Sequence, residues 1–282
     1  MNVTVLASQA EGAPDPTAFA AGWREAAPGD SVAVYEVAQS VERAFALGLP
    51  DAARLDAQAV LDHLASQGRI LVGGREEFDF GRPVLEAAVA RWGSLSAARA
   101  ALGSFVFGAD DEVALRGLNG ASARRAALVG DDVALEAERA AGAFTARVEH
   151  ELAPEDPVRL SLQPYSGAGG GLGFALLALG GRPVHVRELV FAHAGLDAVV
   201  PASDLVVVLL GEFGVQELFS SAVEAVSPRA LAAAVPLVVA CAENHTSRVQ
   251  RAELGVQGTY EVTGSLHDVR AHARRIAHTW SR

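Results

Sequence analysis

Residues 205–210 read Leu-Val-Val-Val-Leu-Leu, an uncharged, valine-rich run of six. A run of this length and composition is typical of a parallel strand that is buried on both faces of its sheet. Leu237–Cys241 has the same character, and Asn2–Leu6 also reads as a strand. Helical patterns separate the runs in the last hundred residues, and this alternation of helix and buried strand predicts a doubly wound parallel sheet.

The composition argues against several classes of protein. The formal net charge is −11, so we expect no basic face for nucleic acid. No stretch of about eighteen uncharged apolar residues is present, so we expect no membrane-spanning helix. Met1–Leu6 lacks the basic start of a signal peptide, and Cys241 is the only cysteine. These features predict a soluble, cytoplasmic protein without disulfides.

The chain contains no lysine, and all 23 of its basic residues are arginine. Arginine differs from lysine because its guanidinium group is planar and binds carboxylates and phosphates through two nitrogens at once. Any phosphate chemistry in this protein must therefore use arginine, backbone N–H groups or a metal ion.

The most prominent motif is Gly167–Gly173, which reads Gly-Ala-Gly-Gly-Gly-Leu-Gly and precedes the apolar stretch Phe174–Leu179. Free N–H groups at the start of a helix bind anions. The motif matches neither the dinucleotide fingerprint nor the Walker A loop. Two interpretations stay open: an anion-binding loop, or a tight turn where a helix packs closely against neighbouring backbone.

Two further loops carry candidate residues. Gly73-Gly74 follows a short buried strand and leads to Asp79, whose carboxylate could bind Mg²⁺ or accept a proton, or simply face solvent. Asn119-Gly120-Ala121-Ser122 could present amide and hydroxyl groups, or form an ordinary turn. The histidines do not have the spacing of metal ligands, so we expect no metal site built from them.

The order of these motifs resembles that of the class II glycerate kinases. The family's glycine-rich turn before an apolar helix stands here as Ser166–Ala178, and its Asn-Gly-Ala-Ser stands as Asn119–Ser122. Its Ala-Asp-Leu-Val strand is similar to Ser203–Val206, and its Gly-Gly-Ser-Ala-Thr-Asn-Asp-Gly-Gly loop aligns without a gap with Gly73–Gly81. The resemblance implies two domains with the active site between them, one domain being built from both chain ends.

Together, the buried strands and the resemblance predict an α/β fold. A doubly wound parallel-sheet domain would come from residues 1–50 and 175–282, and a second, smaller α/β domain from residues 51–174. We select Asp79 and Arg75 as catalytic candidates. The candidates for binding substrate or phosphate are Gly73, Gly74, Asn119, Gly120, Ser122, Gly167, Gly169, Gly170, Gly171 and Gln216.

Several of the family's motifs are replaced. The family's first loop, Asp-Ser-Phe-Lys-Gly-Ser, falls on Ser8–Gly12, which contains no lysine. Its Thr-Gly-Glu-Gly-Arg-x-Asp-x-Gln loop should follow residues 205–210, but a gapless alignment keeps only Gly211 and Gln216. The family's Arg then falls on Glu212 and its Asp on Gly214. Phosphoryl transfer depends on positioned cations and metal ligands, so these replacements predict weakened catalysis.

The resemblance implies ATP-dependent phosphorylation of D-glycerate, with ATP and Mg²⁺ as cofactors and a small anionic molecule as the partner. The replaced motifs predict a divergent member with weak or no kinase activity, which would use neither cofactor if inactive. Two alternatives stay open: an active small-molecule kinase with a rearranged, arginine-based site, and a non-catalytic scaffold or binding protein.

Overall fold

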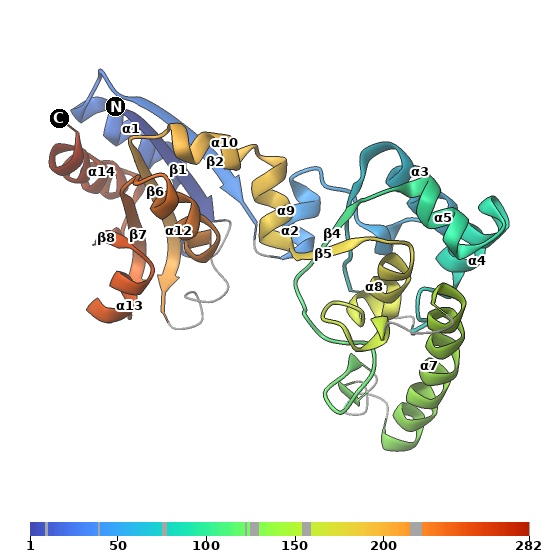
Figure 1. The fold of residues 1–282 in the computed structure, drawn as a ribbon. Helices are drawn as coiled ribbons and strands as arrows, with labels where there is room; N and C mark the ends of the chain where they lie inside the picture. Colours follow the sequence, from blue (N-terminus) through green and yellow to red (C-terminus); the bar gives the residue numbers. More distant parts are fainter. Residues whose placement is uncertain are drawn as a thin grey trace. The chain divides into compact units, whose positions relative to one another are not determined.

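The computed structural model contains two compact units, which are described separately (Figure 1). Unit 1 comprises Met1–Gln39 and Val190–Arg282, and unit 2 comprises Ser40–Leu189. The structure describes residues 1–8, 11–38, 40–74, 78–121, 123–124, 130–153, 159–214 and 222–281. No helix among these residues is both long enough and apolar enough to cross a membrane.

Unit 1 is built on a five-stranded parallel sheet with the order β2-β1-β6-β7-β8. The strands are β1 (Asn2–Ser8), β2 (Ser31–Val37), β6 (Leu205–Phe213), β7 (Leu237–Asn244) and β8 (Val256–Glu261). Val3 of β1 pairs with Leu205 of β6, so strands from the two ends of the chain lie side by side. This confirms the predicted α/β fold with a parallel sheet drawn from both chain ends.

The apolar side chains of β6 pack in two separate hydrophobic clusters because they alternate between the two faces of the sheet. Leu205, Val207 and Leu209 pack in the cluster that also holds Trp23 and Ile276. Val206, Val208 and Leu210 pack in the other cluster. Figure 1 shows helices on both sides of this sheet, with α1 and α14 next to each other. The helices that cover it are α1 (Pro16–Ala26), α10 (Leu196–Val199), α12 (Ala222–Ala232) and α14 (Leu266–Trp280), while α13 (Arg248–Glu253) precedes β8 and η3 (Val200–Ala202) precedes β6.

Unit 2 has a smaller sheet of three parallel strands in the order β3-β4-β5. These are β3 (Arg69–Leu71), β4 (Val106–Ala109) and β5 (Arg182–His185). The other elements are α2 (Val41–Ala46), η1 (Ala52–Arg54), α3 (Ala57–Gln67), α4 (Arg82–Trp92), α5 (Leu95–Leu102), α7 (Asp131–Leu152), η2 (Leu160–Leu162), α8 (Ala168–Ala178) and α9 (Val186–His193), which crosses the boundary between the units.

Helix α8 is the centre of the core of unit 2. Every residue from Gly171 to Ala178 is buried, as expected for a helix that is apolar on all sides. The ring of Phe174 lies 6.2 Å from that of Phe144, which lies 6.1 Å from that of Phe80. The same cluster includes Phe107 of β4, so α8 joins the sheet to the surrounding helices.

The two compact units and the predicted domain ranges place residues 40–50 and 175–189 differently. Helix α2 contacts β3, and the C-terminal part of α8 leads directly to β5, so both segments belong to unit 2. In this division the middle unit, Ser40–Leu189, is the longer one, whereas the predicted middle domain at 51–174 is the smaller one. The cause is the third strand of its sheet, which comes from residues beyond the predicted boundary at 174.

Candidate active site

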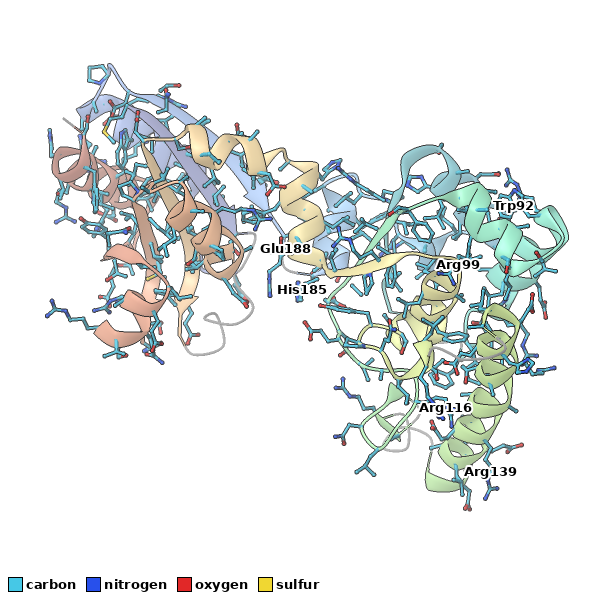
Figure 2. The ribbon with its side chains drawn as sticks, viewed as in Figure 1. Trp92, Arg99, Arg116, Arg139, His185 and Glu188 are labelled. Atoms are coloured by element: carbon cyan, nitrogen blue, oxygen red, sulfur yellow. The ribbon has the colours of Figure 1, made fainter. Side chains whose placement is uncertain are left out.

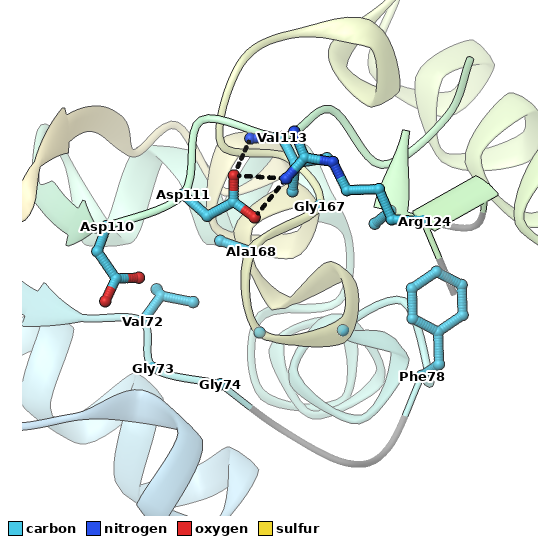
Figure 3. A pocket seen from close by; sticks show the side chains of 13 residues that line it. Val72, Gly73, Gly74, Phe78, Asp110, Asp111, Val113, Arg124, Gly167 and Ala168 are labelled. Atoms are coloured by element: carbon cyan, nitrogen blue, oxygen red, sulfur yellow. Dashed lines mark hydrogen bonds and ion pairs between the residues drawn. The ribbon is translucent and has the colours of Figure 1, made fainter. Parts of the chain in front are cut away.

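The loops after β3 and β4 meet at one edge of the sheet in unit 2. Parallel neighbouring strands end on the same side, and Leu71 pairs with Gly108. Gly73-Gly74 follows β3 and Asp110-Asp111 follows β4, so the two loops lie next to each other. They line a cavity of about 350 Å³ together with Gly167–Gly170 (Figure 3).

The glycine-rich turn enters α8 through three residues with left-handed backbone. The φ angles of Gly169, Gly170 and Gly171 are +57°, +67° and +98°. A Cβ atom on Gly169 would lie 2.8 Å from Cγ1 of Val72, and one on Gly171 would lie 2.6 Å from Cα of Phe80. Both positions thus require glycine for conformation and for space. The close-packing interpretation holds for these two residues, and Gly169 also lines the cavity.

Several N–H groups of this turn already have partners inside the protein. The N–H groups of Gly167 and Ala168 donate to the carbonyls of Val113 and Tyr165, at 3.0 and 3.1 Å. That of Gly171 donates to the carbonyl of Gly167 at 3.3 Å. Each internal bond removes a donor, so the turn offers an anion fewer N–H groups than its sequence suggests.

Asp51 is a site residue that the sequence analysis missed. Its side chain is buried, and its Oδ1 accepts hydrogen bonds from the N–H groups of Gly73 (2.9 Å) and Ala53 (3.0 Å). Asp51 thereby fixes the loop after β3. The available signal was its place just before the short helix at Ala52–Arg54, where an Asp often caps. The contact with Gly73, 22 residues away, is not visible in sequence.

A second cavity, of about 520 Å³, adjoins the first and shares Gly73, Gly74 and Asp110 with it. Glu42 and Arg54 also line this cavity. The guanidinium of Arg54 lies 4.3 Å from the centre of the Phe45 ring, and its Nε lies 3.4 Å from Oδ2 of Asp51. The adjoining cavities therefore combine carboxylates with one further guanidinium.

Arg124 is the only cation among the described residues that line the first cavity. Its Nη1 lies 3.0 and 2.9 Å from the two carboxylate oxygens of Asp111. Oδ1 of Asp111 also accepts a hydrogen bond from the N–H of Val113 at 3.2 Å. Figure 3 shows the two side chains pointing toward each other across the cavity lining. The one described cation that lines this cavity is thus already paired with a carboxylate.

Two residues beside the glycine turn have strained backbone. Tyr165 and Phe80 have φ angles of +67° and +63°, which are uncommon for residues with a side chain. The N–H of Phe80 donates to the carbonyl of Gly170 at 3.1 Å, and the hydroxyl of Tyr165 donates to Glu112 at 2.7 Å. Burial and the nearby Glu112 raise the pKa of the Tyr165 hydroxyl, so it stays protonated at neutral pH.

His185, at the end of β5, interacts electrostatically with Glu112, the carboxylate that accepts the hydrogen bond of Tyr165. Burial is the main cause that lowers the pKa of this imidazole, and Arg187 lowers it further. Nδ1 of His185 accepts a hydrogen bond from the N–H of Arg187 at 3.3 Å. Arg116 forms an ion pair with α7, because its Nε lies 3.5 Å from the carboxylate of Glu138. Figure 2 labels His185 and Arg116.

The structure brings together five of the predicted binding residues, since Gly73, Gly74, Gly167, Gly169 and Gly170 line one cavity. The other described candidates are not among its lining residues. Oδ1 of Asp79 accepts the N–H of Gly81 within its own loop, at 2.9 Å. Asn119 is exposed, Gly120 is buried, and Gly171 packs against Phe80. Arg75, Ser122 and Gln216 lie outside the described residues.

The carboxyl ends of the central strands of unit 1 are acidic. Glu212 of β6 is the register partner of Glu243 of β7. Nε2 of His245 lies 3.8 Å from the Glu212 carboxylate and 3.2 Å from that of Glu243. In the part of the chain that the structure describes, no group of three or more His, Cys, Asp or Glu side chains is arranged to hold a metal ion.

Comparison with known proteins agrees with this architecture. The crystal structure of putative glycerate kinase 2 from Salmonella typhimurium LT2 superposes with a TM-score of 0.72 and 17% sequence identity. The match covers 99% of this chain and 98% of that one, and at this identity it establishes the fold alone. A comparison with curated proteins finds no match. The model of the glycerate kinase family matches residues 80–281, well over half of the chain. The chain therefore belongs to the glycerate kinase family.

Proposed function

We propose that this protein binds a small hydroxy acid of the glycerate type in the cavity of unit 2 and phosphorylates it from ATP slowly or not at all. Family membership supports the substrate class. The proposed loss of activity is supported by one observation, the ion pair between Arg124 and Asp111. Arg124 is the only cation among the described residues that line the first cavity, and Asp111 already neutralises its charge.

Phosphoryl transfer requires stabilisation of the negative charge that moves with the transferred group. The transferred group carries negative charge that positioned cations must stabilise, and a single such cation is worth about a thousandfold or more in rate. The chain has no lysine. Arg54 lies beside Asp51 and Arg124 beside Asp111, so each guanidinium is already close to a carboxylate.

Mg²⁺ and ATP are proposed as cofactors because the chain belongs to the glycerate kinase family. Mg²⁺ is usually held by one or two carboxylates together with phosphate oxygens. Glu42 and Asp110 line the second cavity and supply oxygen ligands of this kind, so the residues present fit the ion. When bound, Mg²⁺ would neutralise charge on the phosphate groups. The protein's own part would be to position the acid against the loop at Gly73-Gly74.

A second candidate function is an active kinase with an arginine-based site. Arg54 favours it, because this guanidinium lines the second cavity and is oriented by the Phe45 ring and by Asp51. Arg75 follows Gly74 directly in the sequence and is another residue that could supply positive charge. The third possibility, a scaffold without a ligand, predicts that neither substrate binds.

A thermal-shift panel separates these functions. D-glycerate and ATP–Mg²⁺ are each tested, with glycerol as the uncharged control for glycerate. A ligand present at a hundred times its Kd stabilises the folded protein by about 2.7 kcal/mol. We expect D-glycerate to raise the melting temperature and glycerol to leave it unchanged. Failure of both D-glycerate and ATP–Mg²⁺ to stabilise the protein would contradict the proposal and favour a scaffold.

A further inference from the structure

The pair formed by Asp111 and Arg124 is placed where a ligand would meet it. Asp111 follows β4, whereas Arg124 lies in the segment after Gly120, whose carbonyl accepts the Arg124 N–H at 3.0 Å. Both side chains line the cavity next to the glycine-rich turn (Figure 3). About half of each side chain is exposed, at 52% for Asp111 and 58% for Arg124. A ligand can therefore reach both charges.

The geometry of the pair leaves Arg124 able to bind a second acid. Asp111 contacts Nη1 alone, with both of its oxygens. The strongest arginine–carboxylate geometry instead uses two guanidinium nitrogens in parallel. An exposed ion pair contributes little stability, so an incoming carboxylate can compete with Asp111 at low cost.

The other described residues that line the cavity offer an anion no further positive charge, so the binding of an acid depends on the Arg124 guanidinium. Apolar side chains, among them Val72, Phe78 and Val113, cover much of the cavity. Its other described charges are the carboxylates of Asp110 and Asp111, which repel an anion. Among the described lining residues, an acid that enters thus meets one cation and two carboxylates, and its affinity depends on whether it or Asp111 holds Arg124.

We propose that Arg124 binds the carboxylate of the small hydroxy acid and that Asp111 competes for the same guanidinium. Asp111 thereby limits the affinity of the site. This inference rests on the proposed function, because it names the residue that recognises the proposed substrate class. It makes an unusual prediction: removing the charge of one partner weakens binding, and removing the charge of the other strengthens it.

The test measures the affinity of the full chain for D-glycerate by calorimetry, in four variants beside the wild type. For Arg124→Ala and Arg124→Gln we expect at least roughly tenfold weaker binding, since a charge-assisted hydrogen bond is lost. For Asp111→Asn we expect binding about threefold or more tighter, because a competing charge is removed. Arg91→Ala is the matched control and should leave affinity unchanged, because Arg91 pairs with Asp62 in the same unit and neither residue lines the cavity.

The outcomes separate this inference from the proposed function. Wild-type binding that Arg124→Ala and Arg124→Gln leave intact would overturn the role of Arg124 while the proposed substrate class stands. Weaker binding in Asp111→Asn would overturn the competition, because Asp111 would then support the site. An absence of binding in the wild type and in every variant would overturn both. Circular dichroism checks that each variant is folded.

Discussion

The two sheets of this protein differ in how much of their structure is encoded locally. The strands of unit 1 are long, and β6 is buried on both faces by side chains that alternate between two cores. The strands of unit 2 have only three or four residues, and loops and glycine turns around them form the cavity. Unit 1 thus relies on continuous apolar strands, whereas unit 2 relies on contacts between segments distant in sequence.

The largest effect is expected from a charge in the sheet of unit 1. Val207→Asp places a carboxylate where the side chain is fully buried. Burying an unpaired charge costs several kcal/mol, a large part of a domain's total stability of about 5–15 kcal/mol. We expect the variant to lose the folded structure of unit 1. Val34→Asp on β2 is the control, because Val34 is 38% exposed and its replacement should cost much less.

Cys241 reports on this loss directly. It is the chain's only thiol and lies in β7, and burial raises its pKa to about 12. A protonated, buried thiol reacts slowly with alkylating reagents. We expect slow labelling in the wild type and in Val34→Asp, and rapid labelling in Val207→Asp. Slow labelling of Val207→Asp would contradict the buried position of β6.

The next effect is expected at the glycine turn of unit 2. Gly171→Ala forces a side chain onto a residue with a φ of +98° and into contact with Phe80. Strain and overpacking of this kind cost about 2–3 kcal/mol. We expect urea unfolding, followed by circular dichroism, to show this loss. Gly74→Ala is the control, because no atom of a described, non-adjacent residue lies within 4 Å of its added Cβ. Equal stability of the two variants would refute the packing role of Gly171.

A smaller effect is expected from Asp51. Asp51→Ala removes the acceptor for the N–H groups of Gly73 and Ala53, and a buried donor left without a partner costs about 1–3 kcal/mol. Asp51→Asn keeps one side-chain oxygen and should cost less. Urea midpoints of the two variants measure the difference. If Asp51→Ala is as stable as the wild type, Asp51 does not fix the loop after β3.

The smallest effect concerns pH. Burial lowers the pKa of His185, so the unfolded chain takes up this proton more readily than the folded one. Stability should therefore fall as the pH drops below about 6.5, the ordinary pKa of histidine. His185→Gln should make the urea midpoint less sensitive to a change from pH 8 to pH 5. Burial also lowers the pKa of His272, which is present in both the wild type and His185→Gln. The contribution of His185 is therefore the difference between the pH sensitivities of these two proteins. An unchanged sensitivity would contradict the burial of His185.

The sequence predicted the parts of the fold that depend on local pattern. The apolar runs at 205–210 and 237–241 correspond to β6 and β7. β6 continues to Phe213 because Glu212 and Phe213 pair with Glu243 and Asn244, which the hydrophobic pattern does not indicate. The predicted boundary at 174 differs from the end of unit 2 for a similar reason, since β5 is a short strand whose partner, β4, lies more than seventy residues earlier.

The candidate site was predictable only where a motif is continuous. The glycine-rich stretch and Gly73-Gly74 were found from their composition, and they line one cavity. The contacts of Asp51 with Gly73 and of Asp111 with Arg124 were missed, because these partners are 22 and 13 residues apart and meet only in the folded chain. Their chemistry depends on tertiary contacts that no spacing rule describes.

A coupled assay of ATP-dependent phosphorylation of D-glycerate, with Mg²⁺ present, tests the central claim most directly. Ordinary kinases turn over about 1–100 times per second. The absence of lysine and the pairing of Arg124 with Asp111 predict turnover at least roughly a thousandfold slower. Turnover near one per second that Arg75→Ala and Asp79→Ala abolish would contradict this account and establish an active, arginine-based kinase.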